Sequence, residues 1–461
     1  MGDIECELRA KMSEVGSAAT EAFLFQYRKL EKRETGLIPE SAIAPIESLP
    51  AAPSSAPQDR INALVGKTVI LKLNGGLGTG MGLEQAKSLL RVRGEQTFLD
   101  IIVRQYLRLR SEVGQGIELL LMNSFSTSAD TREALLRYPE LGDPACHELL
   151  QNKVPKISAD TLRPVAWPAN PALEWCPPGH GDIYPALAGS GVLDRLLSGG
   201  KQFLFVSNAD NLGATLDLAI LNYFAESGAP FLMEVTRRTA ADRKGGHLAR
   251  RRETGRLLLR ESAQCPEEDM AVFQDIDRYR FFNTNNLWIR LEALKEAITE
   301  NHGFIPLPLI QNQKTVDPRD KKSPKVYQLE TAMGAAIESF ADAQALEVRR
   351  DRFAPVKTTA DLLAVRSDAY VLDDRFRLHL LPERHGQPPI ISLSNEYKLV
   401  DALEELVRDE VPSLRACRSL KIAGLWRFEP GVIIRGNVAF RNPTNERKTI
   451  SAGVYADRSL E

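Results

Sequence analysis

The sequence predicts an α/β protein in which a mostly parallel sheet is covered by helices on both faces, followed by a C-terminal parallel β-helix. The first indication is an alternation of short apolar runs, which end in polar or glycine-containing turns, with segments of helical periodicity. Helices that connect parallel strands must pack on the faces of the sheet. The second indication is a six-residue apolar repeat near the C-terminus.

The N-terminal segment, residues 1–60, predicts a helical arm and a linker. Apolar and charged residues recur at helical spacing from about Glu5 to Arg33. The following stretch, "PESAIAPIESLPAAPSSAP", is rich in Pro, Ala and Ser, which is typical of a loose connector. Because 461 residues exceed what one compact core usually holds, we expect about two or three domains.

Residues 61–375 predict the main α/β domain. The expected strands lie at 67–73, 116–124, 201–210 and 229–236, and the clearest helical patterns lie at 98–113 and 215–227. Ligands of such sheets bind at the carboxyl ends of the strands. The residues directly after each strand are therefore the candidates for a functional site.

Residues 376–461 change character and predict a stack of β-coils. Two interleaved series of apolar residues recur every six positions: Leu414, Leu420, Trp426, Val432 and Val438, and Ile422, Phe428, Ile434 and Phe440. Glycines at 424, 431 and 436 lie between them, as turns between coils require. A β-hairpin also has an alternating pattern, so it stays an alternative over so few turns. We favour the parallel β-helix.

The composition is that of an ordinary globular protein of the cytoplasm. The 59 Lys and Arg nearly balance the 61 Asp and Glu, which disfavours a broad nucleic-acid or membrane surface. The five cysteines lie far apart without a CxxC pair, so neither a disulfide framework nor a zinc site is expected. No stretch approaches the roughly 18 to 20 apolar residues of a membrane span.

The stretch "LKLNGGLGTGMG", residues 71–82, follows an apolar run and predicts an anion-binding turn. A Walker loop fails, because Gly80 is followed by Met81 rather than Lys. The dinucleotide fingerprint also fails by its spacing. What remains is a strand entering a glycine-rich turn whose backbone N–H groups can converge on a phosphate. Lys87, just downstream, suits a polyphosphate as a point charge.

Eight segments in order closely resemble the UTP:glucose-1-phosphate uridylyltransferase family of the eukaryotic type. They are "LKLNGGLGTGMG...AKS", "LMNSFSTSADT", "WCPPGHGDIY", "FVSNADNLGA", "MEVTRRTAADRKGG", "FFNTNNLW", "QLETAMGAAI" and "RFAPVKTTADLL". The resemblance implies a Rossmann-like, GT-A-like nucleotidyltransferase domain with a mixed sheet flanked by helices, and a left-handed parallel β-helix behind it. The implied reaction joins UTP and glucose 1-phosphate into UDP-glucose, with release of pyrophosphate and with Mg²⁺ as the cofactor.

The resemblance also assigns the phosphate-handling residues. Asp210, at the end of an expected strand, corresponds to the metal ligand, and a single carboxylate suffices for Mg²⁺ that also holds phosphate oxygens. Asn208 corresponds to a sugar-phosphate contact. Lys87 and Lys357 correspond to the lysines that bind the triphosphate, and Lys357 to the catalytic one. The family motif around the first lysine is "GPKS"; this chain has "QAKS", which changes the turn before Lys87.

The remaining implied contacts fall into two groups. Those to UTP, beside Lys87, Asp210 and Lys357, are Leu73, Asn74, Gly75, Gly76, Gln151 and Gly179. Those to the sugar phosphate are His180, Asn283, Asn285 and Gly246, the last in a glycine turn with Lys244 and Gly245. An amide such as that of Gln151 can donate and accept at one edge of uracil. An imidazole at His180, neutral or cationic, can donate to the sugar phosphate.

Two alternatives stay open. The enzyme could use another hexose 1-phosphate or an N-acetylhexosamine 1-phosphate, although "NGGLGTGMG" differs from "GGxGTRLG", with Gly80 at the place of Arg. A non-catalytic nucleotide-sugar sensor is disfavoured, because Asp210, Lys87 and Lys357 are all present. We expect UTP and glucose 1-phosphate as small-molecule partners, no nucleic acid and no membrane. The C-terminal coils could cap a monomer or join a homo-oligomer.

Overall fold

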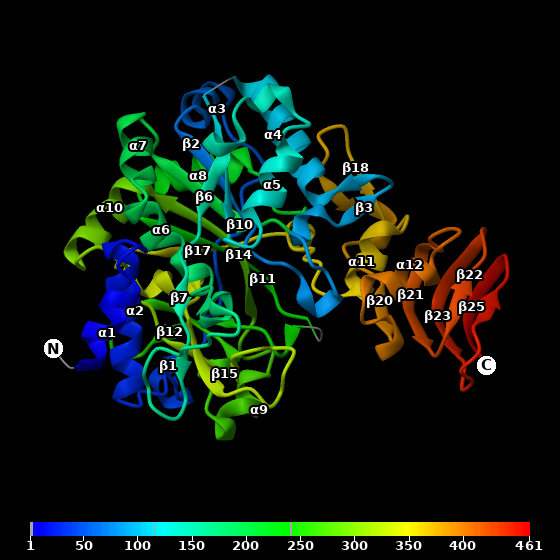
Figure 1. Ribbon diagram of the computed structural model, residues 1–461. Helices are drawn as coiled ribbons and strands as arrows, with labels where there is room; N and C mark the ends of the chain where they lie inside the picture. Colours follow the sequence, from blue (N-terminus) through cyan, green and yellow to red (C-terminus); the bar gives the residue numbers. More distant parts are fainter. Residues whose placement is uncertain (1–2, 115, 240–241) are drawn as a thin grey trace.

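A computed structural model describes residues 3–114, 116–239 and 242–461 of the chain. Residues 1 and 2 of the expected arm, and residues 240 and 241 of the motif "MEVTRRTAADRKGG", lie outside the described residues. Figure 1 shows a large body in which helices surround a central sheet, and a smaller C-terminal part beside it. Within the described residues, no helix has the length and apolar character needed to cross a membrane.

The central sheet is mixed, with ten strands. Its path runs β1-β12-β14-β10-β2-β5-β6, and β11, β13 and β17 join at the sides. The bounds are β1 Ile43–Ala44, β2 Thr68–Leu73, β5 Glu118–Asn123, β6 Glu148–Leu150, β10 Phe203–Asn208, β11 Phe231–Arg237, β12 His247–Arg251, β13 Leu257–Arg260, β14 Phe281–Arg290 and β17 Gln344–Glu347. All four expected strands, now β2, β5, β10 and β11, are therefore confirmed.

The direction of the strands is only partly as expected. Strands β10, β2, β5 and β6 are parallel, whereas β14 runs antiparallel to both β10 and β11. The expectation of a mostly parallel sheet is thus too simple. After β11 the chain first makes the antiparallel pair β12–β13 and then enters the sheet between β10 and β11 from the opposite end. Apolar periodicity reports burial of a strand and carries no information about its direction.

Helices cover both faces, as expected, because alternate residues of each strand point to opposite sides. Ile70 of β2 packs in a cluster with α3 Gln58–Val65, α4 Phe98–Val113 and α8 Leu218–Ser227. Its neighbours Val69 and Leu71 pack with α6 Ile183–Gly189, α7 Val192–Ser198 and α10 Leu291–Glu300. Both sides of β2 are therefore buried, which explains its uninterrupted apolar run.

The N-terminal arm forms two helices, α1 Asp3–Lys11 and α2 Ser17–Glu31, which pack on the strand pair β15 Ile310–Thr315 and β16 Lys325–Glu330. The expectation of a loose connector after them is wrong. Strand β1 pairs with β12, and the N–H of Ala52 donates to the carbonyl of Glu347 at 2.8 Å. A segment rich in Pro and Ala can form an extended strand at a sheet edge as well as a linker. Here the segment is hydrogen-bonded to the edges of the sheet.

The C-terminal part contains two small sheets in which every strand pairing is parallel. The strands are β20 Ile390–Leu393, β21 Ser413–Ala423, β22 Trp426–Phe428, β23 Val432–Arg441, β24 Lys448–Ile450 and β25 Gly453–Leu460. Leu420 pairs with Val438, 18 residues later, which spans three six-residue repeats. A hairpin would pair antiparallel, so the hairpin alternative is excluded.

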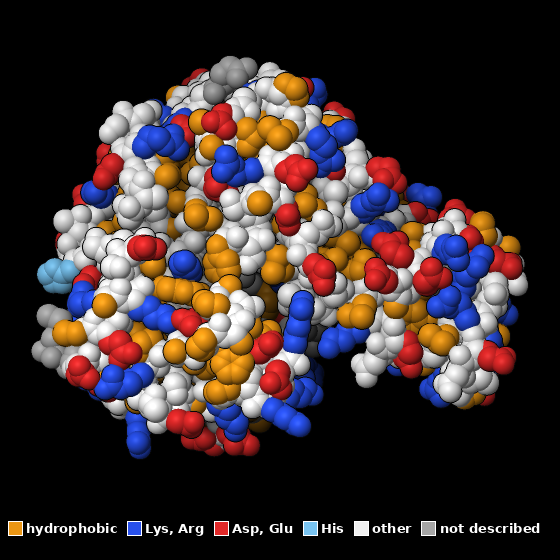
Figure 2. Space-filling view, viewed as in Figure 1, with side chains coloured by type: hydrophobic (Ala, Val, Ile, Leu, Met, Phe, Trp, Pro, Cys, Tyr) orange, Lys and Arg blue, Asp and Glu red, His pale blue; other side chains and the backbone are white. Residues whose placement is uncertain are grey.

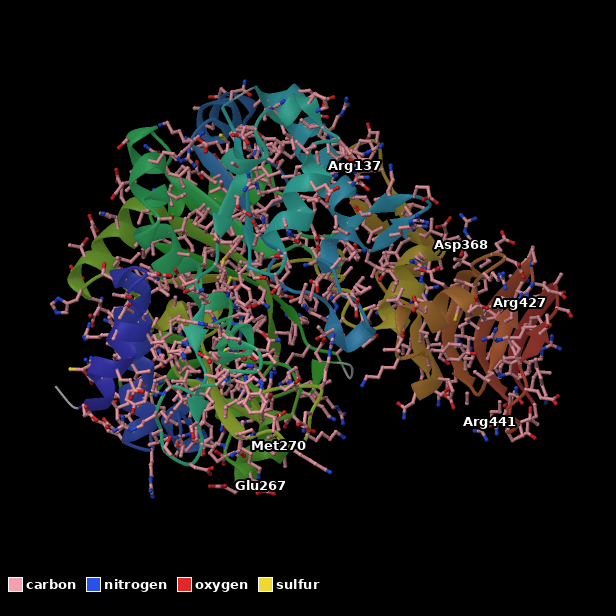
Figure 3. All side chains as sticks on the ribbon, in the orientation of Figure 1. Arg137, Glu267, Met270, Asp368, Arg427 and Arg441 are labelled. Atoms are coloured by element: carbon pink, nitrogen blue, oxygen red, sulfur yellow. The ribbon has the colours of Figure 1, made fainter. Side chains whose placement is uncertain are left out.

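The C-terminal part is joined to the body by packing and by side chains. One apolar cluster runs from β2 and α4 through α11 Thr359–Arg366 and α12 Val400–Leu406 into the coils. At the junction lies Asp368, which is labelled in Figure 3. It accepts hydrogen bonds from Ser413 Oγ at 2.6 Å and from Leu414 N at 2.7 Å. The expected boundary after residue 375 falls inside a hairpin of β18 Tyr370–Leu372 and β19 Leu378–Leu380.

The surface agrees with the balanced composition. Figure 2 shows acidic and basic side chains interspersed over the visible face, and a notch between the body and the C-terminal part.

Candidate active site

A cavity of about 440 Å³ opens at the carboxyl ends of β2, β5 and β10, where the parallel strands predicted a site. Its walls come from the glycine loop, the ends of these strands, the "PPGHGD" turn, the β15–β16 pair and the segment before α11. The lining residues are Leu73, Asn74, Gly75, Gly76, Lys87, Ser88, Met122, Gln151, Pro177, Gly179, His180, Asn208, Ala209, Asp210, Lys314, Gln328, Glu330 and Lys357.

The glycine loop is shaped to bring Lys87 back over its own turn. Gly78 has φ +70°, and a methyl group there would lie 3.2 Å from Cγ of Lys87. The N–H of Lys87 donates to the carbonyl of Gly76 at 3.0 Å. Glycine is thus needed both for the left-handed backbone and for the close approach of the lysine stem.

The changed exit of the loop, "QAKS", keeps a defined turn. Ala86 is fully buried, and its N–H donates to Oδ2 of Asp130 at 3.1 Å. Gln85 is exposed. The lysine that follows is therefore anchored through its own backbone and through Ala86, without the glycine and proline of the family motif.

Asp210 gathers the two expected lysines. Its Oδ2 accepts from Nζ of Lys87 at 2.7 Å and from Nζ of Lys357 at 2.8 Å. Lys87 also donates to the carbonyl of Val356. Burial alone would raise the pKa of Asp210, but the charges and hydrogen bonds of Lys357 and Lys87 outweigh it and hold that pKa below the usual 3.8. The carboxylate is therefore ionised at neutral pH.

The other carboxylate oxygen of Asp210 is the point where a metal fits. Among the described residues, Oδ1 is a buried polar atom without a hydrogen-bond partner. A buried anionic oxygen left in this state favours an added cation. Also within the described part of the chain, no three His, Cys, Asp or Glu side chains cluster as metal ligands. The donor set therefore suits Mg²⁺ that takes most of its ligands from phosphates and water.

The residues expected at the uridine end come together around Gln151. Nε2 of Gln151 donates to the carbonyl of Gly179 at 2.8 Å. A methyl group on Gly75 would lie 2.9 Å from Oε1 of Gln151, so a larger residue there would displace the amide of Gln151. Asn74 differs from the rest, because its Nδ2 donates to Asn123 and Thr131 inside the core. Its amide is therefore bound within the core rather than directed at a ligand.

His180 lies in the cavity wall in a defined protonation state. The N–H of Met333 donates to Nδ1 of His180 at 3.0 Å, so the ring proton resides on Nε2. Burial, with a smaller effect of the Lys357 charge, lowers the pKa of His180 from 6.5 to about 4. The ring is consequently neutral at pH 7, and the cationic form considered from the sequence is not populated.

Three expected sugar contacts lie outside this cavity lining as described: Asn283, Asn285 and Gly246. Nδ2 of Asn283 donates to Oδ1 of Asn285 at 2.8 Å, and Asn285 has φ +59° in an irregular part of β14. A methyl group on Gly246 would lie 2.4 Å from Oε2 of Glu261. In the described structure Gly246 therefore packs closely against Glu261, and the two asparagines form a hydrogen-bonded turn in which Asn285 is left-handed.

Sequence reasoning did not single out Lys314, Gln328 and Glu330, which line the cavity from β15 and β16. The sequence contains part of the information needed to find them. Gln328 and Glu330 lie on alternate positions of "KVYQLE", so they share one face of the strand, and "QLETAMGAAI" was among the matched motifs. No local pattern tells that this strand pair reaches across to the glycine loop.

Comparison with known proteins shows relatives over most of the chain. A family model described as UTP--glucose-1-phosphate uridylyltransferase matches residues 18–435. The chain is 41% identical over 419 residues to the UTP--glucose-1-phosphate uridylyltransferase of Hordeum vulgare, covering 91% of this chain and 86% of that protein. It is 42% identical over 373 residues to that of Saccharomyces cerevisiae, covering 81% and 73%.

Solved structures match over the whole chain. A mutant of UDP-glucose pyrophosphorylase from Leishmania major, in complex with UDP-Glc, superposes with a TM-score of 0.96 at 49% identity, covering 100% of this chain and 99% of that one. The UDP-glucose phosphorylase from Trypanosoma brucei superposes with a TM-score of 0.91 at 48% identity, with the same coverage. With a matched family model, these relatives and the cavity described above, the chain belongs to the UTP--glucose-1-phosphate uridylyltransferase family.

Proposed function

We propose that the chain transfers the uridylyl group of UTP to α-D-glucose 1-phosphate, forming UDP-glucose and pyrophosphate. The observation that carries this proposal is the convergence of Lys87 and Lys357 on one carboxylate, Asp210, beside a glycine loop. A phosphate oxygen of the sugar phosphate attacks the α-phosphorus, the bond from that phosphorus to the bridging oxygen breaks, and pyrophosphate leaves with the bond's electron pair.

Positioning and charge stabilisation are the protein's share of such a reaction. When UTP binds, its phosphates replace Asp210 as the partners of Lys87 and Lys357, and the two ammonium groups then offset charge that develops around the α-phosphorus. Nε2–H of His180 donates to the sugar phosphate, and Gln151 with the backbone of Leu73 to Gly76 holds the uridine. Asn208 and the Asn283–Asn285 turn lie toward the sugar.

Mg²⁺ is the cofactor that we propose, with Oδ1 of Asp210 as its ligand from the protein. The buried, unpartnered state of that oxygen among the described residues supports this choice. When bound, the metal supplies charge neutralisation between the phosphates and aligns them. Asp210 itself stays ionised for this purpose, because the neighbouring lysines lower its pKa.

The C-terminal sheets support a left-handed parallel β-helix as their finer description. Parallel pairing in both sheets supports this description, and the 18 residues between the paired Leu420 and Val438 correspond to three hexads per turn. We place this coil domain from β20 onward, the catalytic body before it, and the helical arm at the N-terminus. A homo-oligomer through the coils and a cytoplasmic location stay predictions from the sequence.

An assay of pyrophosphate release tests the proposal. With UTP, Mg²⁺ and a panel of sugar 1-phosphates, we expect kcat/KM to be highest for glucose 1-phosphate. A higher value for an N-acetylhexosamine 1-phosphate or another hexose 1-phosphate would transfer the proposal to that substrate. Binding of UTP without pyrophosphate release from any sugar phosphate would instead favour a nucleotide-sugar sensor.

A further inference from the structure

Lys357 extends from a segment whose position must be set by other residues. Its side chain is 58% exposed, so packing of the lysine itself cannot hold it in place. The segment 350–358 consists of a short turn, Arg350–Arg352, and an irregular stretch that ends where α11 begins at Thr359. An exposed lysine on irregular backbone loses considerable conformational entropy when it is ordered.

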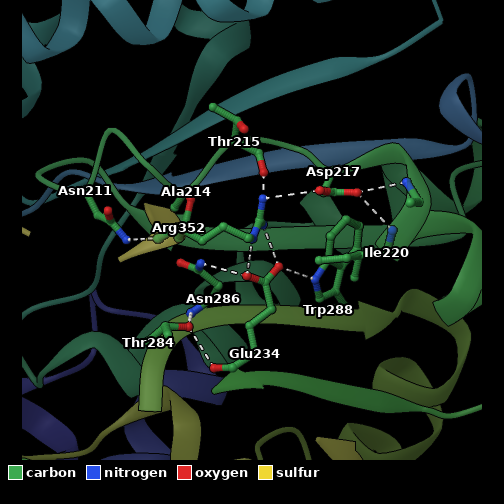
Figure 4. A network of polar contacts seen from close by, with 12 residues as sticks. Asn211, Ala214, Thr215, Asp217, Ile220, Glu234, Thr284, Asn286, Trp288 and Arg352 are labelled. Carbon is green, nitrogen blue, oxygen red and sulfur yellow. Dashed lines mark hydrogen bonds and ion pairs between the residues drawn. The ribbon is translucent and has the colours of Figure 1, made fainter. Parts of the chain in front are cut away.

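The segment is anchored by a buried ion pair between Arg352 and Glu234 of β11. Nε of Arg352 donates to Oε2 of Glu234 at 2.7 Å, and Nη2 donates to Oε1 at 2.6 Å. Nη2 also donates to the carbonyl of Thr215 at 3.1 Å. Glu234 is 0% exposed and Arg352 is 9% exposed. Figure 4 shows the two side chains meeting at the centre of a polar network.

A second set of contacts ties the same segment to the loop of Asp210. Oδ1 of Asn211 accepts from the N–H of Ala354 at 3.0 Å, and its Nδ2 donates to the carbonyl of Arg352 at 3.1 Å. The N–H of Val356 donates to the carbonyl of Asp210 at 3.1 Å. These hydrogen bonds hold the backbone that leads to Lys357 against the backbone beside Asp210, on both sides of Pro355.

Glu234 also contacts β14, the strand that contains the expected sugar contacts Asn283 and Asn285. Its carboxylate accepts from Nδ2 of Asn286 and from Nε1 of Trp288, each at 2.9 Å. Its own carbonyl accepts from Oγ1 of Thr284 at 2.7 Å. All three partners belong to β14, the strand that also contains the left-handed turn residue Asn285. One buried carboxylate thus contacts β14, the Lys357 segment and, through Arg352, the Asp210 loop.

We propose that Glu234 and Arg352 are positioning residues of the uridylyl transfer: their ion pair holds the backbone that carries Lys357 in register with Asp210 and with the Asn285 turn. The proposal rests on the proposed function and adds residues that touch neither substrate nor metal. A buried ion pair is a poor means of stabilising a fold, because apolar residues of similar volume are usually as stabilising. Its contacts with three site-forming segments indicate a geometric role instead.

Variants can separate position from stability. Arg352→Met leaves the Glu234 carboxylate buried without its ionic partner, which should cause a loss of stability, measured as a lower Tm. The double variant Glu234→Gln with Arg352→Met removes both charges and recovers most of that loss. We expect kcat to stay at least about tenfold below wild type in the double variant, because the link from β11 to the Lys357 segment is still absent. Arg352→Lys retains one donor and should restore part of kcat.

Arg290→Met is the matched control. Arg290 lies at the far end of β14, where its guanidinium donates to the carbonyls of Phe224, Ala225 and Ala229. This variant also removes a guanidinium that holds backbone carbonyls. We expect a lower Tm and an unchanged kcat. A kcat loss in Arg290→Met equal to that in the double variant would show that destabilisation alone lowers turnover, and would overturn the proposal.

A mutant cycle tests whether the pair acts through Lys357. In wild type, Arg352→Met should lower kcat, whereas in a Lys357→Ala background the same change should lower it little further. Hydrogen exchange at the amides of Ala354 and Val356, measured without substrate, should become faster in Arg352→Met and in the double variant. Full additivity in the cycle, or unchanged exchange at these amides, would overturn the proposal. Failure of the proposed function is distinguishable from these outcomes, because the wild-type protein itself would then release no pyrophosphate.

Discussion

The ammonium group of Lys357 lies 2.8 Å from Oδ2 of Asp210, although the two residues are 147 positions apart in the chain. Lys87 contacts the same oxygen, so one carboxylate holds two lysines of the site. This arrangement keeps a buried charge paired. It also means that phosphates which displace the carboxylate find the cations already in place, which reduces the ordering needed on binding.

Replacement of Lys357 by Ala should lower kcat by about 10²–10³-fold, the usual loss when one charge-stabilising group is removed. The Tm should change little, because an ion pair with an exposed lysine contributes roughly 0–1 kcal/mol. Pyrophosphate release and thermal unfolding measure the two effects. Lys295→Ala is the control, since Lys295 forms a surface ion pair with Asp194 at 2.7 Å. Near-normal turnover of Lys357→Ala would remove that lysine from the catalytic step.

Asp210→Asn should abolish the tight binding of a divalent cation in the presence of UTP. An amide oxygen is a much weaker ligand for Mg²⁺ than a carboxylate. Mn²⁺ as a spectroscopic probe reports the affinity directly, independently of turnover. Asp194→Asn, on the surface, is the control. Equal Mn²⁺ affinity in Asp210→Asn and wild type would contradict the ligand assignment.

The His180 imidazole predicts a pH dependence of stability. Its pKa is about 4 in the folded protein and 6.5 ordinarily, so between these values the unfolded chain binds a proton that the folded chain does not. The stabilising contribution is therefore present above pH 6.5 and is lost as pH falls toward 4. Urea unfolding of wild type and His180→Leu between pH 4 and 7 measures it. The wild-type stability should fall relative to the variant as the pH falls; a constant difference would contradict this.

The same variant tests the role of the imidazole in binding. His180→Leu removes the Nε2–H donor and keeps the volume of the side chain approximately. We expect KM for glucose 1-phosphate to rise by about tenfold, the loss of one hydrogen bond to a charged group, while KM for UTP changes little. An equal rise of both KM values would contradict the assignment to the sugar phosphate.

Ala86→Pro restores one residue of the family motif before Lys87. Ala86 has φ −53° and ψ 126°, which proline adopts without strain. The change loses the hydrogen bond from Ala86 N to Asp130 and gains the rigidity of proline, so the free energy of unfolding should change by less than about 1 kcal/mol. The kcat should stay within about twofold of wild type. A large loss of kcat would show that "QAKS" requires its own turn geometry.

Gly213→Ala should disturb the site through the backbone alone. A methyl group on Gly213 would lie 2.2 Å from the carbonyl oxygen of Asp351, so the Lys357 segment has to move away from the Asp210 loop. We expect kcat to fall by about tenfold or more. Gly66→Ala, where a methyl group meets nothing within 4 Å, is the control and should keep wild-type turnover. Wild-type kcat in Gly213→Ala would argue against a strict position for this segment.

Much of this fold is predictable from the sequence, for identifiable physical reasons. The expected strands at 67–73 and 201–210 are β2 and β10, because a short continuous apolar run is typical of a strand that is buried on both faces of a sheet. The six-residue repeat predicted parallel coils, because identical spacing places apolar residues at equivalent positions of each turn. The glycine loop and Asp210 were recognised because their chemistry is local to a short motif.

Other features depend on residues that are distant in the chain, and the sequence carried no local sign of them. The inward amide of Asn74, the antiparallel entry of β14 and the paired connector strand β1 all follow from which elements become neighbours.

The sequence by itself determined the family, the buried strands and the identity of the charged residues at the site. These features depend on residues that are close together in the chain. Only the tertiary structure decided that Lys87 and Lys357 share one oxygen of Asp210 and that Glu234 and Arg352 hold the segment in place. Those contacts form where separate segments pack together, and packing is a property of the whole chain.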